Sequence, residues 1–154
     1  MQTTTPVTTA KGGTTSAGEF LDRLLLATNA HDVAAIVECF GPDYRNETPA
    51  HPSRGFRGAD QVRRNWEQIL THVPDLVATV PRRSVDGDTV WAEMEMSGTR
   101  RDGAAHRMRG VVIFGVSGDR AEWARFYMEP VTDGGENVNQ AVHRHVAPAS
   151  GDTT

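Results

Sequence analysis

The chain has 154 residues, of which 38% are hydrophobic, and this length gives room for one globular domain with a sizeable core. The net charge of −4, with no basic run clear of acidic neighbours, argues against a nucleic-acid or anionic-membrane surface. A single cysteine excludes an internal disulfide. Because no run resembles a membrane helix or a signal peptide, we expect a cytoplasmic protein whose residues 1–15, rich in Thr and Gly, form a disordered tail.

The first half of the chain contains three helical patterns. Apolar residues at helical spacing predict a first helix from Ser16 and a second, short helix capped by Asp32. A third helix is expected over residues 60–73, with Trp66 on its inward stripe and a proline after its last residue. These stripes are the large apolar surfaces that can cover a sheet.

One strand pattern lies between the second and third helices, and four more follow the third helix. Residues 43–48 predict a short strand in which Tyr44 and Asn46 share one face. Residues 76–85 predict a longer strand, and residues 90–130 predict a meander of three more strands joined by two turns.

The meander alternates between an apolar, even-numbered face and a charged, odd-numbered face. The even face carries Met94, Met96, His106, Met108, Phe126 and Met128, and the odd face carries Trp91, Glu93, Glu95, Arg107, Arg109, Trp123, Arg125, Tyr127 and Glu129. Since successive strand side chains point to opposite sides, the sheet is expected to have an apolar interior and a charged, aromatic exterior.

The turns also predict how the strands pair. Hairpins centred on the two turns set Met96 opposite Met108, and Met128 opposite Met108 as well. A slip of one residue would turn Arg107 and Arg109 against the methionines, at a cost of several kcal/mol per unpaired ion, so this register is preferred.

Helices gathered before an antiparallel sheet indicate an α+β fold. We predict a cone-shaped α+β barrel, in which a curved antiparallel sheet wraps around the N-terminal helices and leaves a cavity at its wide end. Residues 132–154 form a polar C-terminal extension with a candidate helix over residues 136–146.

Four short motifs occur along the chain: Asn29-Ala30-His31-Asp32, Phe56-Arg57-Gly58, Val73-Pro74-Asp75-Leu76 and Arg125-Phe126-Tyr127-Met128-Glu129. Over residues 16–131, their order resembles the nuclear transport factor 2-like superfamily, in its SnoaL-like polyketide cyclase, ketosteroid isomerase and limonene epoxide hydrolase branch. The resemblance implies the cone-shaped fold. It leaves the function open, because the superfamily contains isomerases, cyclases, hydrolases and non-catalytic binders.

The resemblance to the limonene epoxide hydrolases extends to single residues. Tyr44-Arg45-Asn46 is similar to a Tyr-x-Asn pair that helps those enzymes hold the attacking water. Their Arg-x-Asp falls on Met94-Glu95-Met96, and their last-strand Asp falls on Phe126, which argues against their mechanism unless a one-residue slip brings Glu93 and Glu95 inside. The acid/base Asp of the polyketide cyclases is also absent from the aligned position.

The candidate catalytic residues are His106, Tyr44 and Asn46. His106 is the inward group that titrates near neutral pH, so it could move a proton while Tyr44 and Asn46 fix the substrate or a water. Alternatively, His106 is a hydrogen-bonded residue near a turn, and the other two satisfy each other or the backbone. The candidate substrate-binding residues, which could also fill an ordinary core, are Trp66, Met94, Met96, Met108, Phe126 and Met128.

These residues predict an enzyme without cofactor or metal that acts on a small apolar metabolite by proton transfer, as an isomerase, a cyclase or an epoxide-opening enzyme. The alternative is a non-catalytic module that binds a hydrophobic ligand or dimerises. We expect no nucleic-acid or membrane partner. The aromatic outer face predicts a homodimer formed through Trp91, Arg109, Trp123, Arg125 and Tyr127.

Overall fold

A computed structural model describes residues 16–149 of the chain, so the predicted tail of residues 1–15 lies outside the described residues. The elements are α1 (Ser16–Asn29), α2 (Val33–Glu38), β1 (Phe40–Glu47), the 3-10 turn η1 (Pro52–Arg54), β2 (Phe56–Arg57), α3 (Ala59–His72), β3 (Val77–Asp86), β4 (Thr89–Thr99), β5 (Ala105–Ser117), β6 (Arg120–Pro130) and α4 (Val138–Val146). The predicted order of three helices, a short strand among them and four long strands is confirmed.

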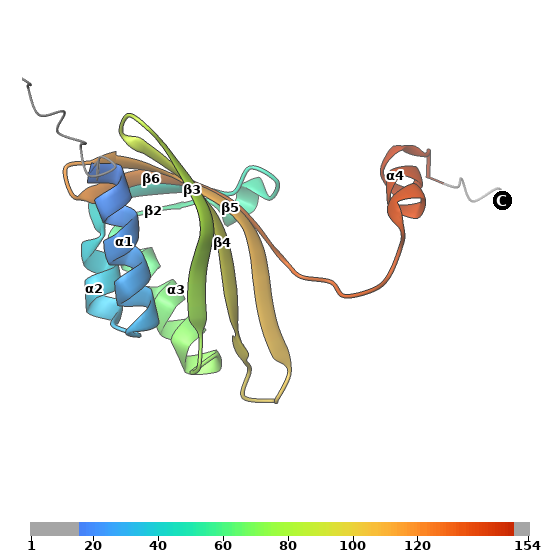
Figure 1. Ribbon diagram of the computed structural model, residues 1–154, viewed down its shortest axis with the longest axis horizontal. Helices are drawn as coiled ribbons and strands as arrows, with labels where there is room; N and C mark the ends of the chain where they lie inside the picture. Colours follow the sequence, from blue (N-terminus) through green and yellow to red (C-terminus); the bar gives the residue numbers. More distant parts are fainter. Residues whose placement is uncertain (1–15, 150–154) are drawn as a thin grey trace, which may run out of the picture.

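The six strands form one curved sheet in the order β2-β1-β6-β5-β4-β3, and the sheet bends over α1, α2 and α3 (Figure 1). The predicted α+β fold, a curved sheet around the N-terminal helices, is confirmed. Two details differ from the prediction. The sheet is mixed, because β1 pairs with β6 in parallel, and it is an open sheet with edges at β2 and β3 rather than a closed barrel.

One part of the core lies between α1 and the strands β3 to β5. Phe20 of α1 is fully buried, and its ring lies edge-on to Phe40 and Phe114 at centroid distances of 6.2 and 5.1 Å. Buried aromatic pairs of this geometry contribute both apolar burial and favourable ring contacts. The helix α3 packs instead against α2 and β1, which leaves the neighbouring part of the sheet less tightly covered.

The β4–β5 hairpin has the predicted register, with Met96 opposite Met108. In the β5–β6 hairpin, Met128 lies opposite Gly110, so its predicted pairing with Met108 is wrong by two residues. One residue of the shift comes from the tight turn and one from a bulge at Glu122. Because two single shifts add up to an even number, the apolar and charged residues stay on the predicted faces.

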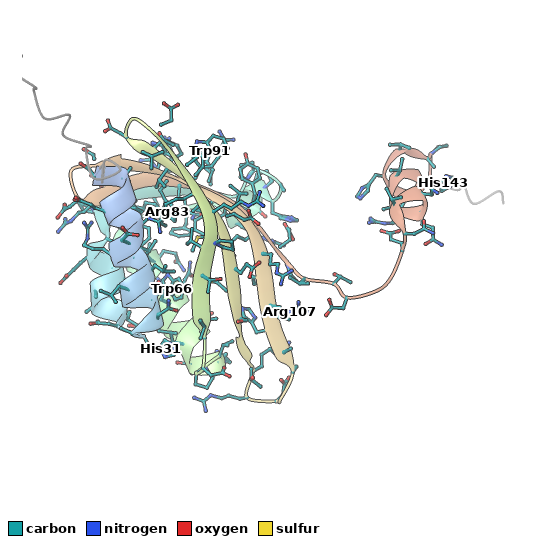
Figure 2. The ribbon with its side chains drawn as sticks, in the orientation of Figure 1. His31, Trp66, Arg83, Trp91, Arg107 and His143 are labelled. Atoms are coloured by element: carbon teal, nitrogen blue, oxygen red, sulfur yellow. The ribbon has the colours of Figure 1, made fainter. Side chains whose placement is uncertain are left out.

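The loop between α1 and α2 is tied to the edge strand β3 and to the residue before it. The Asn29 side chain forms two hydrogen bonds with the Ala78 backbone, donating to its carbonyl at 2.9 Å and accepting from its N–H at 2.8 Å. His31, labelled in Figure 2, has a left-handed φ of 56°, and its Nε2 lies 2.7 Å from the Leu76 carbonyl. The Asn29–Asp32 motif therefore fixes the helices against the sheet.

The helix α4 stands clear of the sheet and the other helices in Figure 1, beyond the segment of residues 131–137. Its first turn is capped by reciprocal hydrogen bonds between Asn137 and Gln140. Val138, Val142 and Val146 are all exposed along it. No helix within residues 16–149 has both the length and the apolar content needed to cross a membrane.

Candidate functional site

A pocket of about 440 Å³ lies between α3 and the inner face of the sheet. Strands β1, β4, β5 and β6 form one side, α3 forms the other, and the segment from η1 to β2 contributes at the edge. The lining comprises Phe40, Tyr44, Asn46, Thr48, Arg54, Phe56, Val62, Asn65, Trp66, Ile69, Met96, His106, Met108, Phe126 and Met128. Both the volume and the mainly apolar surface are typical of small-molecule sites.

Tyr44 and Asn46 form a buried polar pair in this lining, with side chains that are only 1% and 6% exposed. Asn46 Nδ2 donates a hydrogen bond to Tyr44 Oη at 3.0 Å. The backbone N–H of Gly58 donates to the Tyr44 carbonyl at 2.7 Å, which fixes β1 to the start of α3. The backbone of the pair is therefore fixed to the residue that precedes α3.

The surroundings of this pair determine what it can offer to a ligand. Burial raises the pKa of the Tyr44 hydroxyl above its ordinary value, so the group stays protonated at neutral pH. Within residues 16–149, no group accepts the Tyr44 proton and none donates to Asn46 Oδ1. The Tyr44 hydroxyl proton, the second Asn46 N–H and Asn46 Oδ1 are thus available to a carbonyl, a hydroxyl or a water.

His106 lies at the start of β5, where it is half-buried and lines the pocket. Its backbone is paired with Gly98 of β4. In the described part of the chain, its imidazole takes part in no hydrogen bond or ion pair, so the alternative of a hydrogen-bonded histidine at a turn does not describe this residue. The imidazole therefore lines the pocket without a protein partner in the described residues.

The structure places most of the predicted wall residues in the pocket. Trp66 on α3 lies in the space between the helices and the sheet (Figure 2), and Met96, Met108, Phe126 and Met128 line the opposite side. Met94 is the exception. It is 4% exposed and belongs to the hydrophobic core, so its predicted place in the pocket wall is corrected. Met94 lies two residues before Met96 on β4, a strand that α1 also contacts.

The carboxylates of β4 point away from the pocket. Glu95 Oε1 lies 3.3 Å from Arg109 Nε, and Glu93 lies 4.0 Å from Arg82, both on the outer face. The slip that would bring them inside does not occur, and the described lining contains no Asp or Glu. Across residues 16–149, no three His, Cys, Asp or Glu side chains are grouped so that they could hold a metal ion.

Three polar lining residues, Thr48, Arg54 and Asn65, were not predicted as site residues from the sequence. Asn65 is three residues after Val62 on the inward stripe of α3, a spacing that could have identified it. Its Oδ1 accepts a hydrogen bond from Gln61 Nε2 at 2.8 Å. Arg54 lies in η1, within a Pro- and Gly-containing loop whose path no periodic pattern predicts.

We expect replacement of Tyr44 by Phe to lower the free energy of unfolding by about 1–2 kcal/mol, because the buried Asn46 amide loses its acceptor. Urea unfolding monitored by circular dichroism measures this change. Tyr127→Phe is the matched control, since that side chain is 42% exposed on the outer face. An equal effect of the two substitutions would contradict the role of the buried pair.

Comparisons with known proteins agree with this architecture. The model of the SnoaL-like domain family matches residues 21–126. An LEH-like epoxide hydrolase of Mycobacterium tuberculosis superposes with a TM-score of 0.64 at 18% identity, covering 74% of this chain and 83% of the other. IdmH of Streptomyces antibioticus, a proposed polyketide cyclase, gives 0.64 at 20% identity, covering 73% and 91%. A proposed isomerase of Bacillus subtilis gives 0.65 at 20% identity, covering 74% and 86%.

No curated protein matches the chain. At these identities the structural likeness establishes the fold alone, and the family match extends over more than half of the chain. The protein therefore belongs to the SnoaL-like domain family and has its nuclear transport factor 2-like fold.

Proposed function

We propose that this protein is an enzyme that transfers a proton on a small apolar molecule bound in the pocket, without a cofactor. The observation that carries the proposal is the composition of the pocket lining. A hydroxyl donor, a carboxamide and an unpaired imidazole, from Tyr44, Asn46 and His106, interrupt an otherwise mainly apolar surface. Such a surface binds an apolar body and directs its few polar atoms.

The proposed reaction is the removal and return of a proton next to a carbonyl group. The His106 imidazole takes the proton from carbon, and the electron pair of the C–H bond moves to give an enolate. The Tyr44 hydroxyl donates a hydrogen bond to the enolate oxygen, which stabilises the developing charge in a surface poor in water. The imidazolium then returns the proton to carbon, and the bond order shifts back.

The second candidate function is that of a non-catalytic module that binds a hydrophobic ligand. It is favoured by the lack of Asp and Glu in the described lining, because carboxylates are the usual partners of a catalytic histidine. In that case Tyr44 and Asn46 would bind the ligand's carbonyl, and the imidazole would have no chemical role.

Deuterium exchange into 1-tetralone, an apolar ketone with an exchangeable proton next to its carbonyl, distinguishes the two functions. The ketone is incubated with the full chain in D₂O, exchange is followed by proton NMR, and binding is measured by the quenching of tryptophan fluorescence. We expect binding together with exchange faster than in buffer. Binding without accelerated exchange would favour the non-catalytic module, and lack of binding would contradict both functions.

We also propose that the outer face of the sheet forms a homodimer. Trp91 and Tyr127 are 49% and 42% exposed there, while Arg109 and Arg125 are each neutralised by a glutamate, at 3.3 and 3.8 Å. The Trp123 indole packs directly on Gly115, whose bare backbone leaves room for the ring. Exposed aromatic rings among neutralised charges are typical of an interface.

Replacement of Trp91 by Glu is expected to convert this dimer into a monomer, because the substitution introduces a charge into the proposed contact. Light scattering coupled to size exclusion measures the change in mass. Leu26→Glu is the matched control, since it introduces the same charge at a side chain that is 74% exposed on α1. A Trp91→Glu variant with unchanged mass would exclude this face as the interface.

A further inference from the structure

The charged side chains that line the pocket are all basic. Arg54 carries the one permanent charge of the described lining, and His106 becomes positive when it binds a proton. No carboxylate of the described lining balances them. Arg54 is exposed, whereas the Tyr44–Asn46 pair is buried, so the charge lies at the solvent side of the pocket.

The turn that carries Arg54 is held in place by three contacts. The Arg54 N–H donates to the His51 carbonyl at 2.9 Å, and the N–H of the next residue, Gly55, donates to the Pro52 carbonyl at 3.2 Å. The His51 ring is itself fixed, since its Nε2 lies 2.9 Å from Glu129 Oε1 on β6. The backbone beneath the guanidinium is therefore attached to the sheet.

The carboxylates on the neighbouring strands are engaged elsewhere. Glu129 contacts His51, and Glu47 is 3.1 Å from Arg45 and 3.8 Å from Arg125. Among residues 16–149, none forms an ion pair or a hydrogen bond with the Arg54 side chain. The guanidinium is thus available to an anion at the pocket mouth.

We propose that the ligand of this pocket is an apolar molecule with one anionic group, such as a carboxylate, and that Arg54 binds this group at the mouth. A guanidinium offers two parallel N–H donors to a carboxylate or a sulfonate, and this arrangement gives orientation as well as affinity. The anion stays near solvent, the apolar body lies along the wall, and an uncharged end reaches Tyr44. This inference rests on the proposed function, because it assigns the substrate class of the same site.

Two fluorescent dyes that differ by one sulfonate test the inference on the full chain. They are 1-anilinonaphthalene-8-sulfonate and its neutral counterpart N-phenyl-1-naphthylamine, each titrated with the wild type and with Arg54→Gln. We expect the variant to bind the sulfonate dye roughly three- to ten-fold more weakly, as is typical for the loss of a partly exposed charge contact. Binding of the neutral dye should not change, which also shows that the variant is folded.

Three controls make the outcomes separable. Arg57→Gln removes an exposed arginine of β2 that does not line the pocket, and it should affect neither dye. Met108→Trp fills the pocket and should weaken both dyes. High salt should reduce the preference of the wild type for the sulfonate dye.

If both dyes bind in the pocket and Arg54→Gln weakens neither, or weakens both equally, the anionic substrate class is wrong while the proposed function stands. A loss with Arg57→Gln as large as the loss with Arg54→Gln would also overturn it, because general surface charge would then explain the effect. If Met108→Trp alters the binding of neither dye, the pocket is not a binding site, and both the inference and the proposed function fail.

Discussion

Replacement of His106 by Gln is expected to slow deuterium exchange into 1-tetralone by a factor of about 100 to 10,000, the usual contribution of a positioned general base. Glutamine keeps the polarity and approximate size of the side chain but cannot take up the proton. The His106 imidazole has no hydrogen-bond partner in the described residues, so its removal leaves no other group unsatisfied. Binding of the ketone and the free energy of unfolding should therefore stay close to the wild-type values.

His51→Gln is the matched control for this experiment. His51 contacts Glu129 of β6, but it is not part of the pocket lining. NMR exchange rates for the two variants and the wild type, measured at equal ketone saturation, decide the assignment. An undiminished rate in His106→Gln, or an equal loss in His51→Gln, would exclude His106 as the base.

The fold could be predicted because several short sequence motifs connect backbone segments to one another. Each of these motifs spans only a few residues, so it can be recognised in the sequence. Asn29 pairs with the Ala78 backbone, and Gly58 donates to the Tyr44 carbonyl with a left-handed φ of 93°. Asp75 Oδ1 accepts a hydrogen bond from the Thr99 N–H at 2.6 Å, which links the residue before β3 to the end of β4. In these three motifs Asn29, Gly58 and Asp75 have structural roles, and such roles do not define the chemistry of the pocket.

The two faces of the sheet could also be predicted, although one register could not. The face on which a strand residue lies depends only on whether its number is odd or even. The two-residue shift that set Met128 opposite Gly110 therefore left the apolar and charged residues on their predicted faces. Half of the shift comes from the two-residue turn Gly118-Asp119, which the Gly-Asp pair marks in the sequence. The other half comes from the bulge at Glu122, which no residue pattern marks.

The sequence did not show which inward residues of a strand belong to the closed core and which line the pocket. Met94 and Met96 share a face, yet Met94 is in the core while Met96 lines the pocket. The difference corresponds to the two sets of helix contacts, since α1 packs on β3, β4 and β5 while the pocket lies beside α3. Arg54 was missed for a related reason, since its position depends on the path of a loop.

Replacement of Gly110 by Ala is expected to lower the free energy of unfolding by about 3 kcal/mol, the upper range for overpacking a well-packed site. A Cβ at this position would overlap the Tyr127 carbonyl oxygen and would lie 2.7 Å from Met128 Cα. These are backbone atoms of the neighbouring strand, so no side-chain rotation can relieve the overlap. Relief of the overlap requires β6 to move away from β5. Because Met128 of β6 lines the pocket, this movement would also change the pocket wall.

Gly103→Ala separates this overlap from the general effect of losing a glycine. Gly103 has a left-handed φ of 85°, and no atom lies within 4 Å of the place that a Cβ would take, so the substitution should cost only about 1 kcal/mol of backbone strain. Urea unfolding of both variants gives the comparison, and dye binding reports the pocket. An equal or smaller loss of stability in Gly110→Ala than in Gly103→Ala would contradict the close approach of β5 and β6 at the pairing of Gly110 with Met128.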